Sequence, residues 1–247
     1  MTVVVFAGPS LTDVDRASHP HFDWRGPAEA GDMLRVPVGQ GGVICLIDGY
    51  FDHRPSVRHK ELLLLLSRGI TVLGASSMGA LRAAEMDRYG MIGVGAIYRA
   101  YASGRLTGDD EVALVHAPES WGWKSLSLPL VDCRATVHRA LRARFILPVE
   151  ARILRRAAQA IHYADRTWPA IFEATDMDAA RRHVIRDWIE ACAVSQKRLD
   201  ALDCLAATTT PPVRTMPAPP MVRTTLIEAL ARECGIGLEV LDRAQAR

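Results

Sequence analysis

The chain has 247 residues, of which 49% are hydrophobic, and its formal net charge is +2. Such a chain can bury one large core, or one core with a smaller appendage. The small net charge gives no sign of a nucleic-acid partner. No stretch approaches the roughly 20 apolar residues of a membrane span, and the N-terminus lacks the basic start of a signal peptide. We therefore expect a soluble, cytoplasmic protein without a membrane partner.

Metal and cofactor motifs are absent from the sequence. The five cysteines are scattered without a CxxC pair, which argues against a disulfide framework and against a cysteine-ligated zinc site. The run Asp109-Asp110-Glu111, followed by His116, is better interpreted as capping and salt-bridge residues, because consecutive carboxylates do not share a face. Gly8-Pro9-Ser10 is far from a phosphate-binding P-loop. We expect no metal and no cofactor.

The first half of the chain predicts a strand–helix–strand order. Residues 3–6, 43–47 and 70–73 are apolar runs typical of strands covered on both faces. Between the second and third run, Pro55 suits the first turn of a helix that extends to about residue 68. In the segment 11–40 we expect only a short helix near 27–33 and a short strand in LRVPV. The pattern predicts an α/β fold with a small, mostly parallel sheet of three or four strands.

The second half is predicted to be helical and to pack on this sheet. Residues 134–203 are rich in alanine and arginine and have few strand signals, and five prolines follow in residues 208–220. Helices are also predicted from Ser77 or Met78 to about residue 89, and over 96–103. The expected organisation is a core at 1–130, a helical region at 131–207, a Pro-rich linker at 208–222, and a C-terminal helix and tail at 223–247.

Ser77 is the first candidate for chemistry. The third strand runs into Gly74-Ala75-Ser76-Ser77-Met78-Gly79 and then into a good helix former, which is the local geometry of a nucleophile elbow. Backbone N–H groups at the start of a helix can bind an oxyanion. The alternative is that Ser76 or Ser77 merely caps the helix.

A serine nucleophile needs a base, and histidine or a buried lysine can serve. His59 and His116 are available, and so are two of the few lysines. Lys60 lies in the helix that follows Asp48, although it could instead form a salt bridge with a nearby carboxylate, Glu61, Asp48 or Asp52. Lys197, in SQKRLDAL, is the other candidate, with exposure or pairing to Asp200 as the alternative.

These motifs, in this order, resemble the TfuA-like family. The resemblance rests on Gly8-Pro9-Ser10, IDGYF at 47–51, SVRHKE at 56–61, GASSMGALRAAEM at 74–86, GMIGVG at 90–95 and DDEVALVH at 109–116, and more faintly on QKRLDAL at 196–202. It covers about residues 1–120 well and thins in the helical half.

The resemblance implies a role beside a YcaO enzyme, which activates a peptide amide with ATP so that sulfur replaces its oxygen. The family is similar to a hydrolase with a Ser–Lys pair that releases sulfide from the C-terminal thiocarboxylate of a ThiS-like sulfur carrier. Ser77 would then be the nucleophile, although Ser76 beside it leaves open which hydroxyl acts. Lys60 is the preferred base and Lys197 the reserve. On this mechanism, backbone N–H groups near Met78 and Gly79 would hold the oxyanion. Asp48 and His59 would orient the lysine or steer the tail of the carrier.

Two other functions stay open. The chain could be a non-catalytic adaptor that docks a YcaO enzyme on its peptide, with Ser77 as a helix cap and Lys60 as a salt-bridge residue. A general hydrolase of small esters is disfavoured, because the histidines do not follow a recognisable Ser…Asp…His order.

Overall fold

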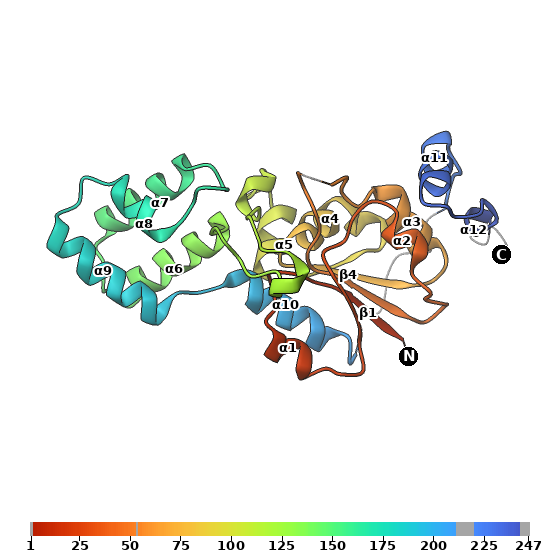
Figure 1. Ribbon diagram of the computed structural model, residues 1–247, viewed down its shortest axis with the longest axis horizontal. Coiled ribbons are helices and arrows are strands. Elements are labelled where there is room, and N and C mark those ends of the chain that lie inside the picture. The colour runs from red at the N-terminus through yellow and green to blue at the C-terminus, as the bar shows by residue number, and fades with distance from the viewer. Residues whose placement is uncertain (1, 53, 211–219, 243–247) are drawn as a thin grey trace. The chain divides into compact units, whose positions relative to one another are not determined.

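The computed structural model describes residues 2–52, 54–210 and 220–242 of the chain. These residues form two compact units, which are described separately: residues 1–107 with 199–247, and residues 108–198. The first unit contains the sheet, and the second is helical (Figure 1). The helix α10, Gln196–Ala207, begins in the second unit and continues into the first.

The sheet of the first unit has five parallel strands in the order β2-β1-β3-β4-β5. The strands are β1 Val3–Phe6, β2 Asp23–Arg25, β3 Val43–Leu46, β4 Thr71–Ala75 and β5 Ile92–Val94. The predicted α/β class and parallel sheet are confirmed, and β1, β3 and β4 are the three strands that the apolar runs predicted. The sheet is larger than expected because β2 and β5 each add an outer strand, one on either side.

The core strands alternate their side chains between two hydrophobic layers, as a strand with a two-residue period must. In β3, Ile44 and Leu46 face one layer, whereas Val43 and Cys45 face the other. All four are buried, so the apolar run in the sequence follows from burial on both faces.

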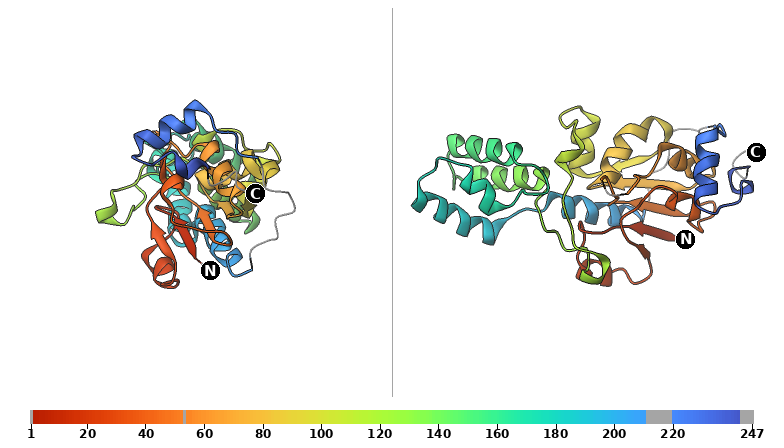
Figure 2. Two further views of the ribbon diagram at one scale, coloured as in Figure 1. Left: turned by 90° about the vertical axis from the view of Figure 1, so that its right-hand side faces the viewer. Right: turned by 45° about the horizontal axis from the view of Figure 1, so that its top comes forward.

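Helices cover both faces of the sheet (Figures 1 and 2). The helices are α1 Asp13–Ala17, α2 Asp32–Arg35, α3 His59–Ser67, α4 Met78–Met86 and α5 Gly95–Ala102. Apolar side chains of α2, α3 and α4 pack on one face, and those of α10, from residue 201 onward, pack on the other. The LRVPV segment is no strand: its Leu34 and Arg35 end α2, and Val36 and Val38 pack into the core beside the sheet.

The C-terminal segment packs on α2 and α3. The helix α11, Thr225–Glu233, buries Ile227, Leu230 and Ala231 against Leu34 and Leu64, and the short α12, Glu239–Asp242, follows it (Figure 2). A helix was predicted at this position. Most of the predicted Pro-rich linker, residues 211–219, lies outside the described residues.

The second unit has its own hydrophobic core, formed by helices α6 to α9. They are α6 Leu130–Arg142, α7 Pro148–Ala160, α8 Trp168–Glu173 and α9 Ala179–Cys192. The guanidinium of Arg166, which is 1% exposed, donates hydrogen bonds to the carbonyls of Ala158, Ile161 and Leu128. One buried side chain therefore ties three segments of this unit together.

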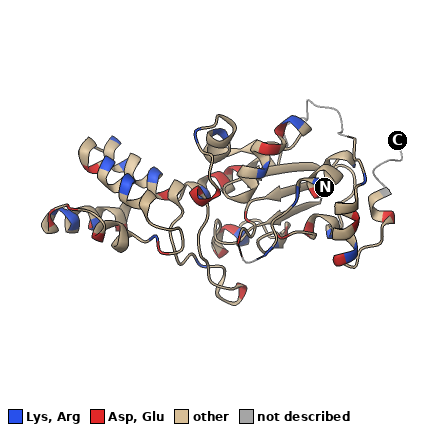
Figure 3. Cartoon of the chain, turned by 90° about the horizontal axis from the view of Figure 1, so that it is seen from above, with Lys and Arg blue, Asp and Glu red and all other residues tan. Residues whose placement is uncertain are grey.

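Acidic and basic residues are interspersed along the helices of both units (Figure 3). Among the described residues, no helix has the length and apolar character needed to cross a membrane.

Candidate functional site

Three loops meet where strands β1, β3 and β4 end. Phe6, Leu46 and Gly74 lie in register in these neighbouring strands. Because the strands are parallel, the residues two positions further on reach the same edge of the sheet. β1 and β3 are neighbours, but the chain continues from β1 to β2 on one side and from β3 to β4 on the other. Open α/β sheets bind their ligands where two neighbouring strands connect in opposite directions in this way.

Asp48 lies at the centre of this edge and is 2% exposed. Its Oδ2 accepts hydrogen bonds from the backbone N–H groups of Gly8 and Ser10 at 2.8 and 2.9 Å. Its Oδ1 accepts from the hydroxyl of Ser10 at 2.7 Å. The Ser10 hydroxyl in turn accepts from the hydroxyl of Ser76 at 2.8 Å. A buried chain of hydrogen bonds therefore links the ends of β3, β1 and β4.

Ser76 holds an unusual backbone conformation. Its φ is 66°, in the region that non-glycine residues rarely adopt. The N–H of Ser77 donates to the carbonyl of Ala75 at 2.8 Å, which closes a γ-turn centred on Ser76. Such a conformation costs about 1–3 kcal/mol and persists only where surrounding contacts hold it. The predicted elbow between strand and helix is present, and Ser76 forms its strained apex.

Ser77 occupies the N-cap position of α4, but its side chain does not cap the helix. Its hydroxyl makes no hydrogen bond to any residue that the structure describes, although the residue is only 3% exposed. The helix-cap alternative for Ser77 is therefore not realised here. The fold described here therefore does not use the Ser77 hydroxyl in its internal hydrogen bonding.

The two predicted oxyanion donors differ in their surroundings. The N–H of Gly79 donates to the carbonyl of Ile47 at 3.2 Å, so it is already used in holding α4 against the end of β3. The N–H of Met78 has no hydrogen-bond partner among the described residues. It therefore remains beside Ser77 at the positive end of the helix dipole.

Lys60 belongs to the first turn of α3, and its Nζ donates to the carbonyl of Val222 at 3.2 Å. Among the described residues, Nζ makes this hydrogen bond alone. The alternative salt bridge to Glu61, Asp48 or Asp52 is therefore not formed, and Lys60 makes no hydrogen bond to Ser77. The side chain is half-buried beneath the C-terminal segment.

Lys197 lies in the helical unit, in the first turn of α10, and is 2% exposed. Its Nζ donates to the carbonyl of Val112 at 3.0 Å, and its N–H donates to Oδ1 of Asp132 at 3.0 Å. Burial raises the pKa of Asp132, although the N–H and the charge of Lys197 act in the opposite direction. Of the two lysines, Lys197 is the more deeply buried.

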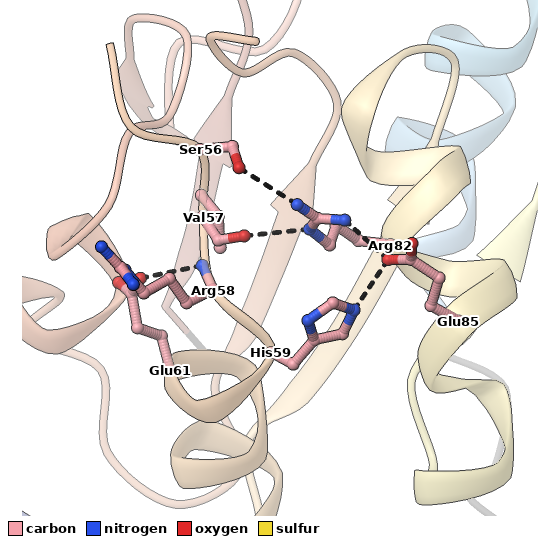
Figure 4. Close-up of polar contacts among 7 residues, drawn as sticks. All are labelled: Ser56, Val57, Arg58, His59, Glu61, Arg82 and Glu85. Carbon is pink, nitrogen blue, oxygen red and sulfur yellow. Dashed lines mark hydrogen bonds and ion pairs between the residues drawn. The ribbon is translucent and has the colours of Figure 1, made fainter. Parts of the chain in front are cut away.

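His59 takes part in a contact between the start of α3 and the helix α4 (Figure 4). Its Nε2 lies 2.8 Å from Oε2 of Glu85, which also pairs with Arg82 at 2.6 Å. Arg82 donates to the carbonyl of Val57 and to the hydroxyl of Ser56. Desolvation raises the pKa of Glu85, but the bonds and charges of His59 and Arg82 outweigh it, so the net effect is a lowered pKa. His59 thus joins the start of α3 to α4, and Arg82 binds the segment before α3.

A pocket of about 550 Å³ adjoins this contact. Its lining comes from α3, from the end of α4 and from the 3-10 helix Asp87–Tyr89 that follows, and includes His59, Leu63, Glu85, Met86 and Tyr89. Ser77 does not line it, so it is separate from the elbow.

Glu61 is a buried carboxyl in the same motif as Lys60 and His59. Its Oε1 accepts from the backbone N–H of Arg58 at 3.0 Å (Figure 4). Its Oε2 accepts from the backbone N–H of Gly31 at 2.7 Å. Burial raises its pKa to about 7 despite these hydrogen bonds, which lower it. Glu61 fixes the start of α3 to the loop before α2.

Ser10 is the site residue that sequence reasoning missed. The motif Gly8-Pro9-Ser10 contributes to the family resemblance and has only a superficial likeness to a phosphate or carboxylate cradle, whereas in the structure this loop holds the chain's own carboxylate, Asp48. The signal was its position directly after a buried strand, the same position that drew attention to Asp48 and Ser77.

Among the described residues, no three His, Cys, Asp or Glu side chains gather to hold a metal ion. The family model for TfuA-like proteins matches residues 48–167, from Asp48 through the elbow and into the helical unit. No curated protein matches the chain.

Proposed function

Because the chain belongs to the TfuA-like protein family through residues 48–167, we propose that it is the partner of a YcaO enzyme in thioamidation of a peptide backbone. Its part in that reaction is to supply sulfide. It does so by hydrolysing the C-terminal thiocarboxylate of a ThiS-like sulfur carrier.

The proposed chemistry needs a serine nucleophile and a base that accepts its proton. The hydroxyl of Ser77 loses its proton to a lysine base and attacks the thiocarboxyl carbon, and the carbon–sulfur bond breaks. Sulfide leaves and takes up that proton, and an ester of Ser77 with the carrier remains. Water then hydrolyses the ester, which restores the serine and gives the carrier a carboxylate. The sum is thiocarboxylate plus water to carboxylate plus hydrogen sulfide.

The observation that carries this proposal is the state of the Ser77 hydroxyl. It lies at the N-terminus of α4, at the edge where ligands bind open α/β sheets, and it has no partner among the described residues. The N–H of Met78 is beside it, and a backbone donor at a helix N-terminus stabilises the negative oxygen that forms during acyl transfer.

The base in this proposal is a lysine, with Lys60 preferred from its motif and Lys197 as the reserve. A neutral lysine at neutral pH requires burial, because desolvation disfavours the ammonium form. Lys197 meets this requirement more closely than the half-buried Lys60. Substitution of each lysine separates the two assignments.

The test is sulfide release from a thiocarboxylated ThiS-like carrier, with the wild type compared with Lys60→Ala and Lys197→Ala. We expect release well above background, and loss of about a hundredfold or more in one lysine variant only. The exposed Lys124→Ala is the matched control, and it should release sulfide at the wild-type rate.

The adaptor hypothesis predicts a different result. If the wild type releases no sulfide above background, even with its YcaO enzyme present, the hydrolase proposal fails. Complex formation with the YcaO enzyme and its peptide, measured by co-purification, would then define the function.

A further inference from the structure

We propose that Ser10 is a positioning residue for the Ser77 nucleophile. Its hydroxyl donates to the carboxylate of Asp48 and accepts from the hydroxyl of Ser76, and so holds the turn that presents the Ser77 hydroxyl. This inference rests on the proposed function of Ser77. Ser10 lies outside both the elbow and the matched residues 48–167, and this role gives the Gly8-Pro9-Ser10 motif a function.

The direction of the hydrogen-bond chain is set at Asp48. An ionised carboxylate can only accept hydrogen bonds, so Ser10 must donate its single hydroxyl proton to it, at 2.7 Å. The oxygen of Ser10 then has only acceptor capacity left, and Ser76 must donate to it, at 2.8 Å. Each hydroxyl therefore has one defined orientation.

Asp48 itself is held firmly. The N–H groups of Gly8 and Ser10 both donate to its Oδ2, so the β1 loop fixes the carboxylate from the backbone. Ser10 is 2% exposed and Ser76 is fully buried, so water does not compete for these bonds. The orientation of the Asp48 carboxylate therefore determines that of the Ser76 hydroxyl through two buried hydrogen bonds.

Ser76 needs such support because of its backbone. Its φ of 66° places it at the centre of the γ-turn that leads into Ser77. A strained conformation persists where neighbouring contacts define it. The hydrogen bond to Ser10 is the side-chain contact that fixes Ser76 across the sheet edge. Loss of the bond lets the turn relax and moves the hydroxyl of Ser77 away from its productive position.

The test compares Ser10→Ala, Ser76→Ala and the double variant with Ser10→Thr, which keeps a hydroxyl at the same place. We expect kcat for sulfide release to fall about tenfold or more in each alanine variant, with KM for the carrier changed less than about twofold. The double variant should be no slower than the slower single variant, because both substitutions break one chain. Ser10→Thr should restore most of kcat.

A second readout does not depend on the carrier. A fluorophosphonate probe acylates a reactive serine, since the serine oxygen bonds to phosphorus and fluoride leaves. Mass spectrometry of the peptide that contains Ser77 measures the labelling rate. This rate should fall by a similar factor in Ser10→Ala and recover in Ser10→Thr.

Ser127→Ala is the control for a purely structural effect. Ser127 is 3% exposed and its hydroxyl accepts from the N–H of Val115 at 2.8 Å, in the helical unit. Its loss should lower Tm without changing kcat. Wild-type kcat and labelling in folded Ser10→Ala would overturn the inference, as would failure of Ser10→Thr to recover activity at normal Tm. If Ser10→Ala does not fold, Ser76→Ala carries the same test, because it breaks the chain without disturbing Asp48.

Failure of this inference is distinct from failure of the proposed function. Ser77→Ala is measured beside the Ser10 variants. Sulfide release at the wild-type rate in Ser77→Ala removes the proposed nucleophile. Loss of activity in Ser77→Ala with full activity in Ser10→Ala removes only the positioning role.

Discussion

The hydroxyl of Ser76 donates to the hydroxyl of Ser10 at 2.8 Å, although 66 residues of sequence separate the two serines. The bond exists because β1 and β4 both run parallel to β3, so that their ends meet at one edge of the sheet. Asp48, at the end of β3, completes the connection. Stability and the proposed chemistry therefore depend on the same few contacts.

Replacement of Asp48 tests how much this edge contributes to stability. In Asp48→Ala the N–H groups of Gly8 and Ser10 lose their acceptor in a buried place, which should lower the free energy of unfolding by about 3 kcal/mol or more. Asp48→Asn keeps one acceptor oxygen and should lower it by less. Urea denaturation measures both. The exposed Asp165→Ala should change it by less than about 0.5 kcal/mol, and an equally small effect of Asp48→Ala would contradict the prediction.

Gly79 tests the close approach of α4 to β3. A Cβ at this position would lie 1.7 Å from the carbonyl oxygen of Leu46, which is backbone and cannot move aside cheaply. Gly79→Ala should therefore lower the free energy of unfolding by about 3 kcal/mol or more, or prevent folding. Gly39→Ala is the matched control, since a Cβ there meets nothing within 4 Å. It should change that energy by less than about 1 kcal/mol, and similar effects of the two variants would refute the packing argument.

Glu61 predicts a pH dependence of stability. Its pKa is about 7 in the folded chain against an ordinary glutamate value of 4.5 in the unfolded chain, so the folded state binds more protons than the unfolded state between these values. Stability contributed by this carboxyl is therefore present at low pH and is lost as the pH rises from 4.5 towards 7. The loss amounts to up to about 3 kcal/mol.

Glu61→Gln cannot titrate, so it removes this dependence. Urea denaturation at about pH 5 and about pH 8 should show the wild type losing more stability than Glu61→Gln over that interval. Parallel pH profiles of the two proteins would show that Glu61 has an ordinary pKa.

Arg166 tests the cohesion of the helical unit. Arg166→Met leaves the carbonyls of Leu128, Ala158 and Ile161 without their shared donor and should destabilise residues 108–198 by about 2–4 kcal/mol. Hydrogen exchange followed by mass spectrometry should show faster exchange in that unit than in residues 1–107. The exposed Arg156→Met controls for loss of charge, and an exchange pattern equal to that of Arg156→Met would contradict the prediction.

The buried strands and the elbow were predictable because their signals are local. Apolar runs identified β1, β3 and β4, and the small residues after β4 identified the turn at Ser76 and Ser77. The edge strands were missed for physical reasons. In β2, Asp23 and Arg25 are charged and none of the three residues is buried, whereas β5 has only three residues with a glycine, Gly93, at its centre, so neither strand shows a long apolar run.

In the structure Gly93 belongs to β5, and the ring of Tyr98 occupies the space that a Cβ at this position would need. The role of Ser10 was not visible for another reason. Its partners, Asp48 and Ser76, are 38 and 66 residues away, and only the parallel register of the strands brings them together.

The proposed nucleophile is tested most directly by the rate of sulfide release from a thiocarboxylated carrier in Ser77→Ala and Ser76→Ala. We expect a loss of about a thousandfold or more in Ser77→Ala, because the attacking oxygen is removed, and a loss of about tenfold in Ser76→Ala. Wild-type release by Ser77→Ala, with the large loss in Ser76→Ala instead, would assign the chemistry to the Ser76 hydroxyl and rule out Ser77 as the nucleophile.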